Sequence, residues 1–218
     1  MAKLKKQHMT IHWKAIVQDD SSIPATEATL KEKATLVGRI GLMMLSVGTG
    51  AWRVRNSMNK VARCLGITCT ADIGLLAISY TCIEGTDTYT QSISLPTTGV
   101  NTHKLMELEL FMKEFPDKVS TYSVKHIHEV LDEIQKLPAN YKAWNLGLAS
   151  ALACGAFTFL LGGGPVEMCC AFLGAGVGNF VRKKMLGHSI SLLANVAVSV
   201  AASCLVYVLT ILLAQSLL

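Results

Sequence analysis

The chain has 218 residues, of which 51% are hydrophobic and 16% charged, and its formal net charge is +5. This weak positive balance, without a stripe of Lys and Arg interleaved with aromatic residues, argues against a nucleic-acid-binding protein. Only four charged side chains follow Lys142, namely Glu167, Arg182, Lys183 and Lys184. Because an ionisable side chain costs about 2.5–3.5 kcal/mol at the centre of a membrane helix, the distribution predicts a soluble part followed by a membrane part.

The N-terminal residues 1–24 are predicted to be a mobile lead. The apolar stretch Ala15–Val17 is short and follows His12 and Lys14, so it does not have the form of a signal peptide. We therefore expect the first 142 residues to stay in the cytoplasm. The seven cysteines form no CxxC pair and are interpreted as small buried side chains rather than as a disulfide framework.

Residues 25–140 are predicted to form a cytosolic α+β domain, with helices packed on a small antiparallel sheet. Apolar residues at helical spacing indicate one helix up to about Val47 and a second over about 51–65, separated by Gly48–Gly50. β-branched and aromatic runs then predict two or three strands, at 67–71, 75–83 and 89–95. Two further helices are expected, at 103–115, ended by Pro116, and at about 124–137.

Residues 141–218 are predicted to be a transmembrane region of about three helical spans. The apolar runs cover about 143–161, 166–181 and 190–213, and a span needs about 20 residues. A turn is expected at Gly162–Pro165. The basic residues Lys136, Lys142 and Arg182–Lys184 fall on one side of such a bundle, and the positive-inside rule makes that side cytoplasmic.

Polar residues inside these spans are the candidates for a solute path. Asn145, Asn179 and Asn195 place one amide in each span, where each could bond to a neighbouring helix or line a polar path. Glu167 is the only acid after residue 142, but a helix N-terminus, where it is expected to lie, favours a carboxylate in any case. Gly174 and Gly178 could serve tight packing or self-association.

No pattern in the chain points to an enzyme, a cofactor or a metal. His126 and His128 would point about 200° apart on a helix, so they cannot share a metal ion. Arg53 and Arg55 could bind an anion at the helix start after Gly50, or could simply be solvated. There is no phosphate-binding loop, nucleophile elbow or pair of acids at a catalytic spacing.

Five short motifs together resemble the threonine/serine exporter (ThrE) family. They occur in the order expected for that family, from about Leu36 to the C-terminus: Gly48–Val54 with Met58 and Leu65–Ile67; Gly99–Asn101; Pro138 with Tyr141–Trp144; Leu161–Gly164; and Leu193–Asn195. The resemblance implies that Gly48, Gly50, Arg53, Gly99, Asn101 and Trp144 organise the cytosolic domain and the start of the first span. Two positions depart from the family, since Gly50 and Arg55 stand where glutamates are common.

The resemblance also implies an activity, a location and partners. The expected function is a subunit that exports small polar metabolites, threonine- or serine-type amino acids or a dicarboxylate, across the inner membrane of a bacterial cell. Expected partners are the lipid bilayer, a second membrane subunit or the missing half of the transporter, and other copies of the chain. Relatives continue beyond a third span, so we expect a shortened or split family member. The alternative is a membrane-anchored interaction or regulatory protein without transport activity.

Overall fold

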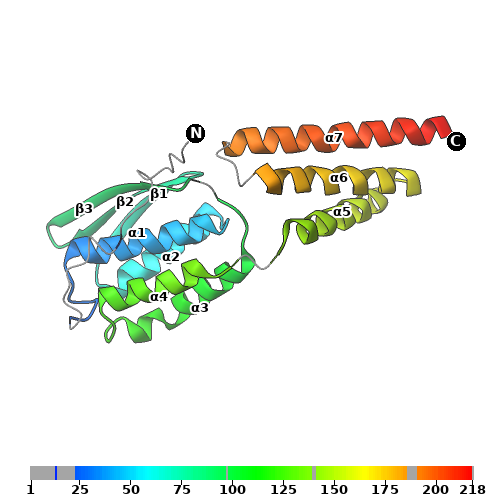
Figure 1. Ribbon diagram of the computed structural model, residues 1–218. Coiled ribbons are helices and arrows are strands. Elements are labelled where there is room, and N and C mark those ends of the chain that lie inside the picture. The colour runs from blue at the N-terminus through cyan, green and yellow to red at the C-terminus, as the bar shows by residue number, and fades with distance from the viewer. Residues whose placement is uncertain (1–12, 14–22, 97, 139–140, 186–190, 218) are drawn as a thin grey trace, which may run out of the picture. The chain divides into compact units, whose positions relative to one another are not determined.

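The structure is a computed structural model that describes residues 13, 23–96, 98–138, 141–185 and 191–217. The predicted lead 1–24 therefore lies almost entirely outside the described residues. The chain divides into two compact units, Met1–Pro138 and Ala139–Leu218, called unit 1 and unit 2 below. Figure 1 labels the seven helices and three strands of the described part.

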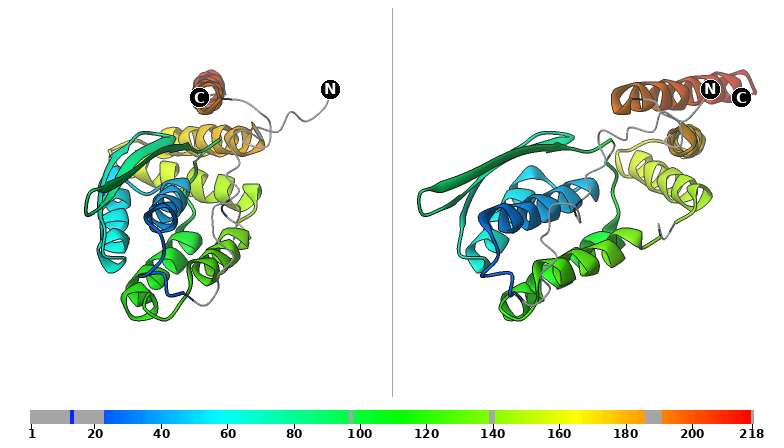
Figure 2. Two further views of the ribbon diagram at one scale, coloured as in Figure 1. Left: turned by 90° about the vertical axis from the view of Figure 1, so that its left-hand side faces the viewer. Right: turned by 60° about the vertical axis from the view of Figure 1, so that its left-hand side comes forward.

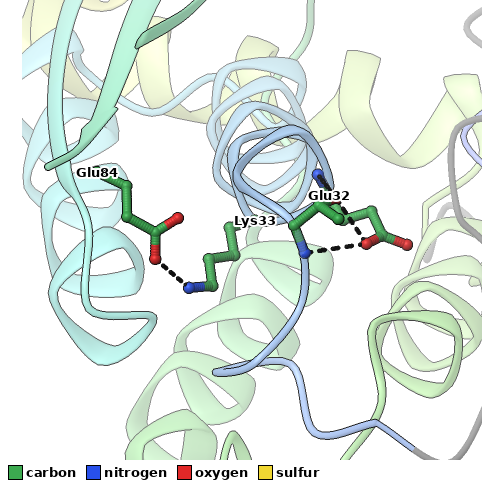
Figure 3. A network of polar contacts seen from close by, with 4 residues as sticks. Glu32, Lys33 and Glu84 are labelled. Atoms are coloured by element: carbon green, nitrogen blue, oxygen red, sulfur yellow. Dashed lines mark hydrogen bonds and ion pairs between the residues drawn. The ribbon is translucent and has the colours of Figure 1, made fainter. Parts of the chain in front are cut away.

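Helix α1 (Leu30–Ser46) is the central element of unit 1. It begins with a capping box, in which the Thr29 side chain accepts from the Glu32 backbone N–H while the Glu32 carboxylate accepts from Thr29. All residues from 32 to 41 are buried, so the helix has no solvated face in this stretch. Lys33 is 4% exposed, and its Nζ lies 2.5 Å from Oε1 of Glu84 (Figure 3).

The sheet consists of β1 (Thr68–Ile73), β2 (Ala77–Glu84) and β3 (Asp87–Ser94), antiparallel and in that spatial order. The strands alternate between two faces, as the period of two in a strand requires. The inner face carries buried residues that join the core: Ile78, Tyr80, Cys82 and Ile93. The outer face is polar and exposed, with Thr81 and Thr90 hydrogen-bonded 2.9 Å apart.

Three helices complete unit 1: α2 (Ala51–Cys64), α3 (Thr102–Lys118) and α4 (Val124–Lys136). Helix α2 packs on α1 and β1, whereas α4 contacts both α1 and α3. Side chains cap two of these helices, since Asn101 accepts from the Lys104 N–H and Ser123 from the His126 N–H. In both Figure 1 and Figure 2, α1 lies between the sheet and the α3–α4 pair.

The predicted helix end at Pro116 is wrong, because α3 continues through this residue to Lys118. A proline has no N–H, so the carbonyl four residues earlier, that of Met112, loses its usual partner within the helix. Lys60 of α2 supplies a replacement, since its Nζ donates to the Met112 oxygen over 2.7 Å. A tertiary contact thus satisfies the backbone group that the proline leaves open.

Unit 2 consists of α5 (Ala143–Leu160), α6 (Pro165–Met185) and α7 (Leu192–Leu217), and glycines allow α6 to approach both neighbours. A Cβ on Gly174 would lie 2.9 Å from the Ser203 carbonyl oxygen, and a Cβ on Gly178 would lie 2.7 Å from the Ser203 Cβ. Of the two interpretations of this glycine pair, the contacts show packing of α6 against α7.

The expected architecture, an α+β cytosolic domain followed by a bundle of about three membrane spans, is wrong. The chain is mostly helical, and its small sheet lies in the middle of the sequence, between α2 and α3. In the described part only α7 is long and apolar enough to cross a membrane, over the 24 residues Leu193–Ser216. Helix α5 offers only the shorter apolar stretch Trp144–Leu160, and α6 bears Glu167 and Arg182–Lys184.

Replacing Lys60 by Met should destabilise unit 1, because the carbonyl of the buried residue Met112 would lose its donor. A buried polar group left without a partner costs about 1–3 kcal/mol, so the apparent Tm of the detergent-solubilised chain should fall by several degrees. Lys113→Met, at an exposed position of α3, is the matched control and should leave the Tm nearly unchanged. Equal Tm values for the two variants would contradict the role given to Lys60.

Candidate functional site

The segment 98–101 lies along the C-terminal end of α1 and satisfies its last carbonyls. The Gly99 N–H donates to the Ser46 oxygen over 3.3 Å, and the Asn101 N–H donates to the Val47 oxygen over 3.2 Å. The Thr98 hydroxyl adds a bond of 2.8 Å to the Leu45 oxygen. The last carbonyls of a helix have no partner further along it, so the segment adds donors to those that the C-cap Val47 and Gly48 already direct to the last turn.

Two glycine-containing motifs that are distant in sequence, Gly48–Val54 and Gly99–Asn101, meet at this junction. Gly48 has a φ of +81°, and a Cβ there would approach the Val100 Cα to 3.1 Å, so only glycine fits without strain. Asn101 then starts α3 by accepting from the Lys104 N–H over 3.1 Å. The structure therefore brings Gly48, Gly99 and Asn101 together, while the organising role assigned to them from sequence stays a prediction.

Gly50 and Arg53 lie at the start of α2. Gly50 is the N-cap residue, and nothing lies within 4 Å of the position a Cβ would take. Arg53 is half-exposed and pairs with Glu109 of α3 at 3.3 Å. This exposed ion pair is compatible with a solvated charge, and anion binding at Arg53 stays a prediction.

A buried cation that the sequence reasoning missed lies in the middle of α1. Arg39 is 1% exposed, and its Nη1 donates to Nδ1 and to the carbonyl oxygen of His128, both at 2.9 Å. Its Nη2 donates to the Asp132 carboxylate. Since arginine only donates, Nδ1 of His128 accepts, and its ring proton lies on Nε2.

Burial lowers the pKa of the Arg39 guanidinium, and the hydrogen bond to Asp132 and its charge oppose that shift. The Trp13 ring covers the guanidinium, with its centroid 5.7 Å from Cζ, and stacks on the His128 ring at 6.3 Å. The sequence contains one indication that Arg39 is buried: it falls on the same helical face as the apolar residues Leu36 and Met43. A cation in such a position must be paired when the face is buried.

Arg39 also borders a small cleft in unit 1 of about 80 Å³, well below the range of about 300–1,000 Å³ that is typical of small-molecule sites. Apolar side chains form most of its wall, and Lys104 and Gln135 contribute polar groups. The Lys104 Nζ donates to the Gln135 carbonyl oxygen over 2.7 Å. The full lining is Trp13, Arg39, Leu42, Met43, Ser46, Val47, Leu95, Lys104, Leu108, Ile134 and Gln135. The cleft is too small to enclose an amino acid or a dicarboxylate as it stands.

The three asparagines of unit 2 lie in different surroundings. Asn145 is exposed on α5, whereas the Asn179 Nδ2 donates to the Leu146 oxygen over 3.1 Å and so joins α6 to α5. Asn195 of α7 is 2% exposed, and its Oδ1 is buried with no donor among the described residues. Within the described part of unit 2, no hydrogen bond connects any two of these amides.

Glu167 and Trp144 lie near the helix starts of unit 2. Glu167 is half-buried in the first turn of α6, and its Oε2 lies 2.8 Å from the position of a Cβ on Gly164. Trp144, in the first turn of α5, is 70% exposed. Over residues 13, 23–96, 98–138, 141–185 and 191–217, no group of three His, Cys, Asp or Glu side chains could hold a metal ion.

Arg39→Met should destabilise the chain far more than the same change at Arg53. Breaking a buried ion pair costs about 3–5 kcal/mol, and we expect about 2–4 kcal/mol here because Asp132 is partly exposed. Arg53→Met removes a pair whose two side chains are both half-exposed and should cost less than about 1 kcal/mol. Thermal unfolding of the two variants in detergent measures the difference, and equal losses would contradict the importance of the Arg39 cluster.

Comparison with known families gives one result. A protein-family model described as "Putative threonine/serine exporter" (ThrE) matches residues 35–217. The match runs from α1 through α7 and thus includes both the Gly48–Asn101 junction and the polar residues of unit 2. Searches among curated proteins and among solved structures gave no significant match. Because the matched region covers most of the sequence, the chain belongs to the threonine/serine exporter (ThrE) family.

Proposed function

We propose that this chain is a subunit of an exporter of small polar metabolites, threonine- or serine-type amino acids or a dicarboxylate, in the membrane of a bacterial cell. The observation that carries the proposal is the family match over residues 35–217. The subunit works with a second membrane protein that supplies the remainder of the path. The proposal takes the solute class from the family and the location from the properties of α7.

Helix α7 supports the membrane location. Its apolar stretch of 24 residues, at 1.5 Å per residue, is about 36 Å long and exceeds a hydrocarbon core of about 30 Å. Only 6% of the most apolar 18-residue stretch of α7 is buried within the structure, whereas the core helix of a water-soluble protein is mostly buried. Lipid is the solvent that such a surface requires.

The basic cluster Arg182–Lys184 supports one orientation of α7. It ends α6 and precedes α7 in the sequence. Positive residues next to a span stay on the cytoplasmic side, so the N-terminal end of α7 faces the cytoplasm. By the same reasoning, unit 1 with its cleft is cytoplasmic and meets the solute before export.

Asn195 is our candidate for a solute contact in unit 2, and Lys104 for one in unit 1. A buried amide oxygen without a donor costs free energy, which a solute ammonium or hydroxyl group would recover. Lys104 offers an ammonium at the edge of the cleft, where its bond to the Gln135 carbonyl is exposed, and the carboxylate of an amino acid or a dicarboxylate would pair with it there.

Export should be measured in cells loaded with a threonine-containing dipeptide, with and without this chain and a co-expressed membrane partner. The expected result is a lower intracellular threonine level and a higher external level when both are present. Succinate and serine are assayed in parallel. If no solute leaves the cell with any partner although the chain is inserted in the membrane, the alternative of a membrane-anchored interaction protein replaces export.

Two variant pairs should separate the solute contacts from structural roles. Asn195→Leu is expected to reduce export at least tenfold, because the chain would lose a polar contact, while Asn145→Leu at an exposed position should keep most of it. Likewise, Lys104→Gln is expected to reduce export, while Lys113→Gln at an exposed position of α3 should keep most of it. Membrane insertion and Tm of each variant are checked first, and export by Asn195→Leu at the unmodified level would remove Asn195 from the path.

A further inference from the structure

Strands β1 and β2 place two cysteines directly opposite each other. The antiparallel register pairs Cys69 with Cys82, and both residues fall on the inner face of the sheet. Cβ atoms of opposite residues in such a pair lie about 4.5–5.5 Å apart, and a disulfide needs about 3.5–4.5 Å. The two thiols are free, and their residues lie opposite each other in the register, so a small closure of the strands would suffice to join them.

The two thiols differ in exposure and in proton affinity. Cys82 is fully buried, and its pKa is raised by the neighbouring Cys69 thiol and by burial. Cys69 is half-buried, and the neighbouring Cys82 thiol lowers its pKa. A partly accessible thiol with a lowered pKa is the reactive type, whereas a buried thiol reacts only with a sulfur already beside it.

No other cysteine among the described residues has a cross-strand partner. Cys64 lies on α2, and the remaining four lie in the helices of unit 2: Cys154, Cys169, Cys170 and Cys204. The arrangement at Cys69 and Cys82 also does not serve the transport proposal, since neither residue lines the cleft or belongs to unit 2. It is an independent feature of the sheet.

We propose that Cys69 and Cys82 form a reversible redox pair that reacts with low-molecular-weight disulfides. Cys69 is the attacking thiol and Cys82 the resolving thiol. The product is an intramolecular disulfide that ties the edge strand β1 to the central strand β2 and thereby couples the stability of unit 1 to the thiol–disulfide balance of its compartment.

The reaction proceeds by two exchanges. The Cys69 thiolate attacks one sulfur of an external disulfide RSSR, which forms the mixed disulfide Cys69–S–S–R and releases the first RS⁻. Cys82 then loses its proton and attacks the Cys69 sulfur, which forms the Cys69–Cys82 bond and releases the second RS⁻. Each leaving thiolate takes up a proton. The two protein thiols thus lose two electrons, and RSSR is reduced to two RSH; an excess of RSH reverses both steps.

The test uses the full-length chain in detergent, with oxidised glutathione as the probe. After treatment, free thiols are alkylated and the peptides are analysed by mass spectrometry. We expect a Cys69–Cys82 cross-link to be the major product, which dithiothreitol removes, and the oxidised chain to have an apparent Tm several degrees higher. Cys64→Ser is the matched control on the adjacent helix and should form the same cross-link.

Two variants test the assigned roles. In Cys82→Ala the resolving thiol is missing, so Cys69 should accumulate as the mixed disulfide with glutathione. In Cys69→Ala neither the cross-link nor an adduct on Cys82 should form. The Tm of each variant shows whether unit 1 is folded, and Cys82→Ser is the replacement if the alanine variant is unfolded. The proposal is overturned if Cys69 and Cys82 of the unmodified chain stay fully alkylatable, or if Cys82 forms the adduct before Cys69.

Discussion

The burial of α1 is the constraint on which the rest of unit 1 depends. A helix that is buried on every side from residue 32 to residue 41 cannot carry unpaired charge, yet this stretch contains Lys33 and Arg39. Each cation therefore fixes a different neighbour. Lys33 pairs with Glu84 at the end of β2, and Arg39 pairs with Asp132 of α4. The two ion pairs therefore link α1 to different neighbours, one to the sheet and the other to α4.

In unit 2, small residues rather than charges determine how closely α6 packs against α7. Gly174 and Gly178 leave no room for a Cβ against α7, and Ser203 donates to the Gly174 oxygen over 2.9 Å. Small residues at a helix contact let the two backbones approach each other closely. The same packing buries Asn195 and leaves its amide oxygen without a donor in the described structure, an unusual arrangement outside a functional site.

Local patterns predicted much of the backbone but failed where a distant residue supplies the missing partner. The strands near 68–73, 77–84 and 87–94 and the helices before and after them were visible in the alternation and spacing of apolar residues. Pro116 was assigned as a helix end, because nothing near it in sequence shows that Lys60 would bond to Met112. Three spans were expected from the avoidance of charge, but α5 is too short in apolar length and α6 too charged at its ends.

The sequence by itself determined the family, the positions of the helices and strands, and the contrast between a charged and an apolar part, because each depends on residue types and short-range spacing. Only the tertiary structure decided which polar groups are buried and with whom they pair. Arg39 shares a helical face with apolar residues, but only the structure shows that Asp132 and His128 of α4 lie against it. Likewise, Cys69 and Cys82 became neighbours only through the register of β1 on β2. Pairing across the fold depends on contacts between distant residues, which no local pattern contains.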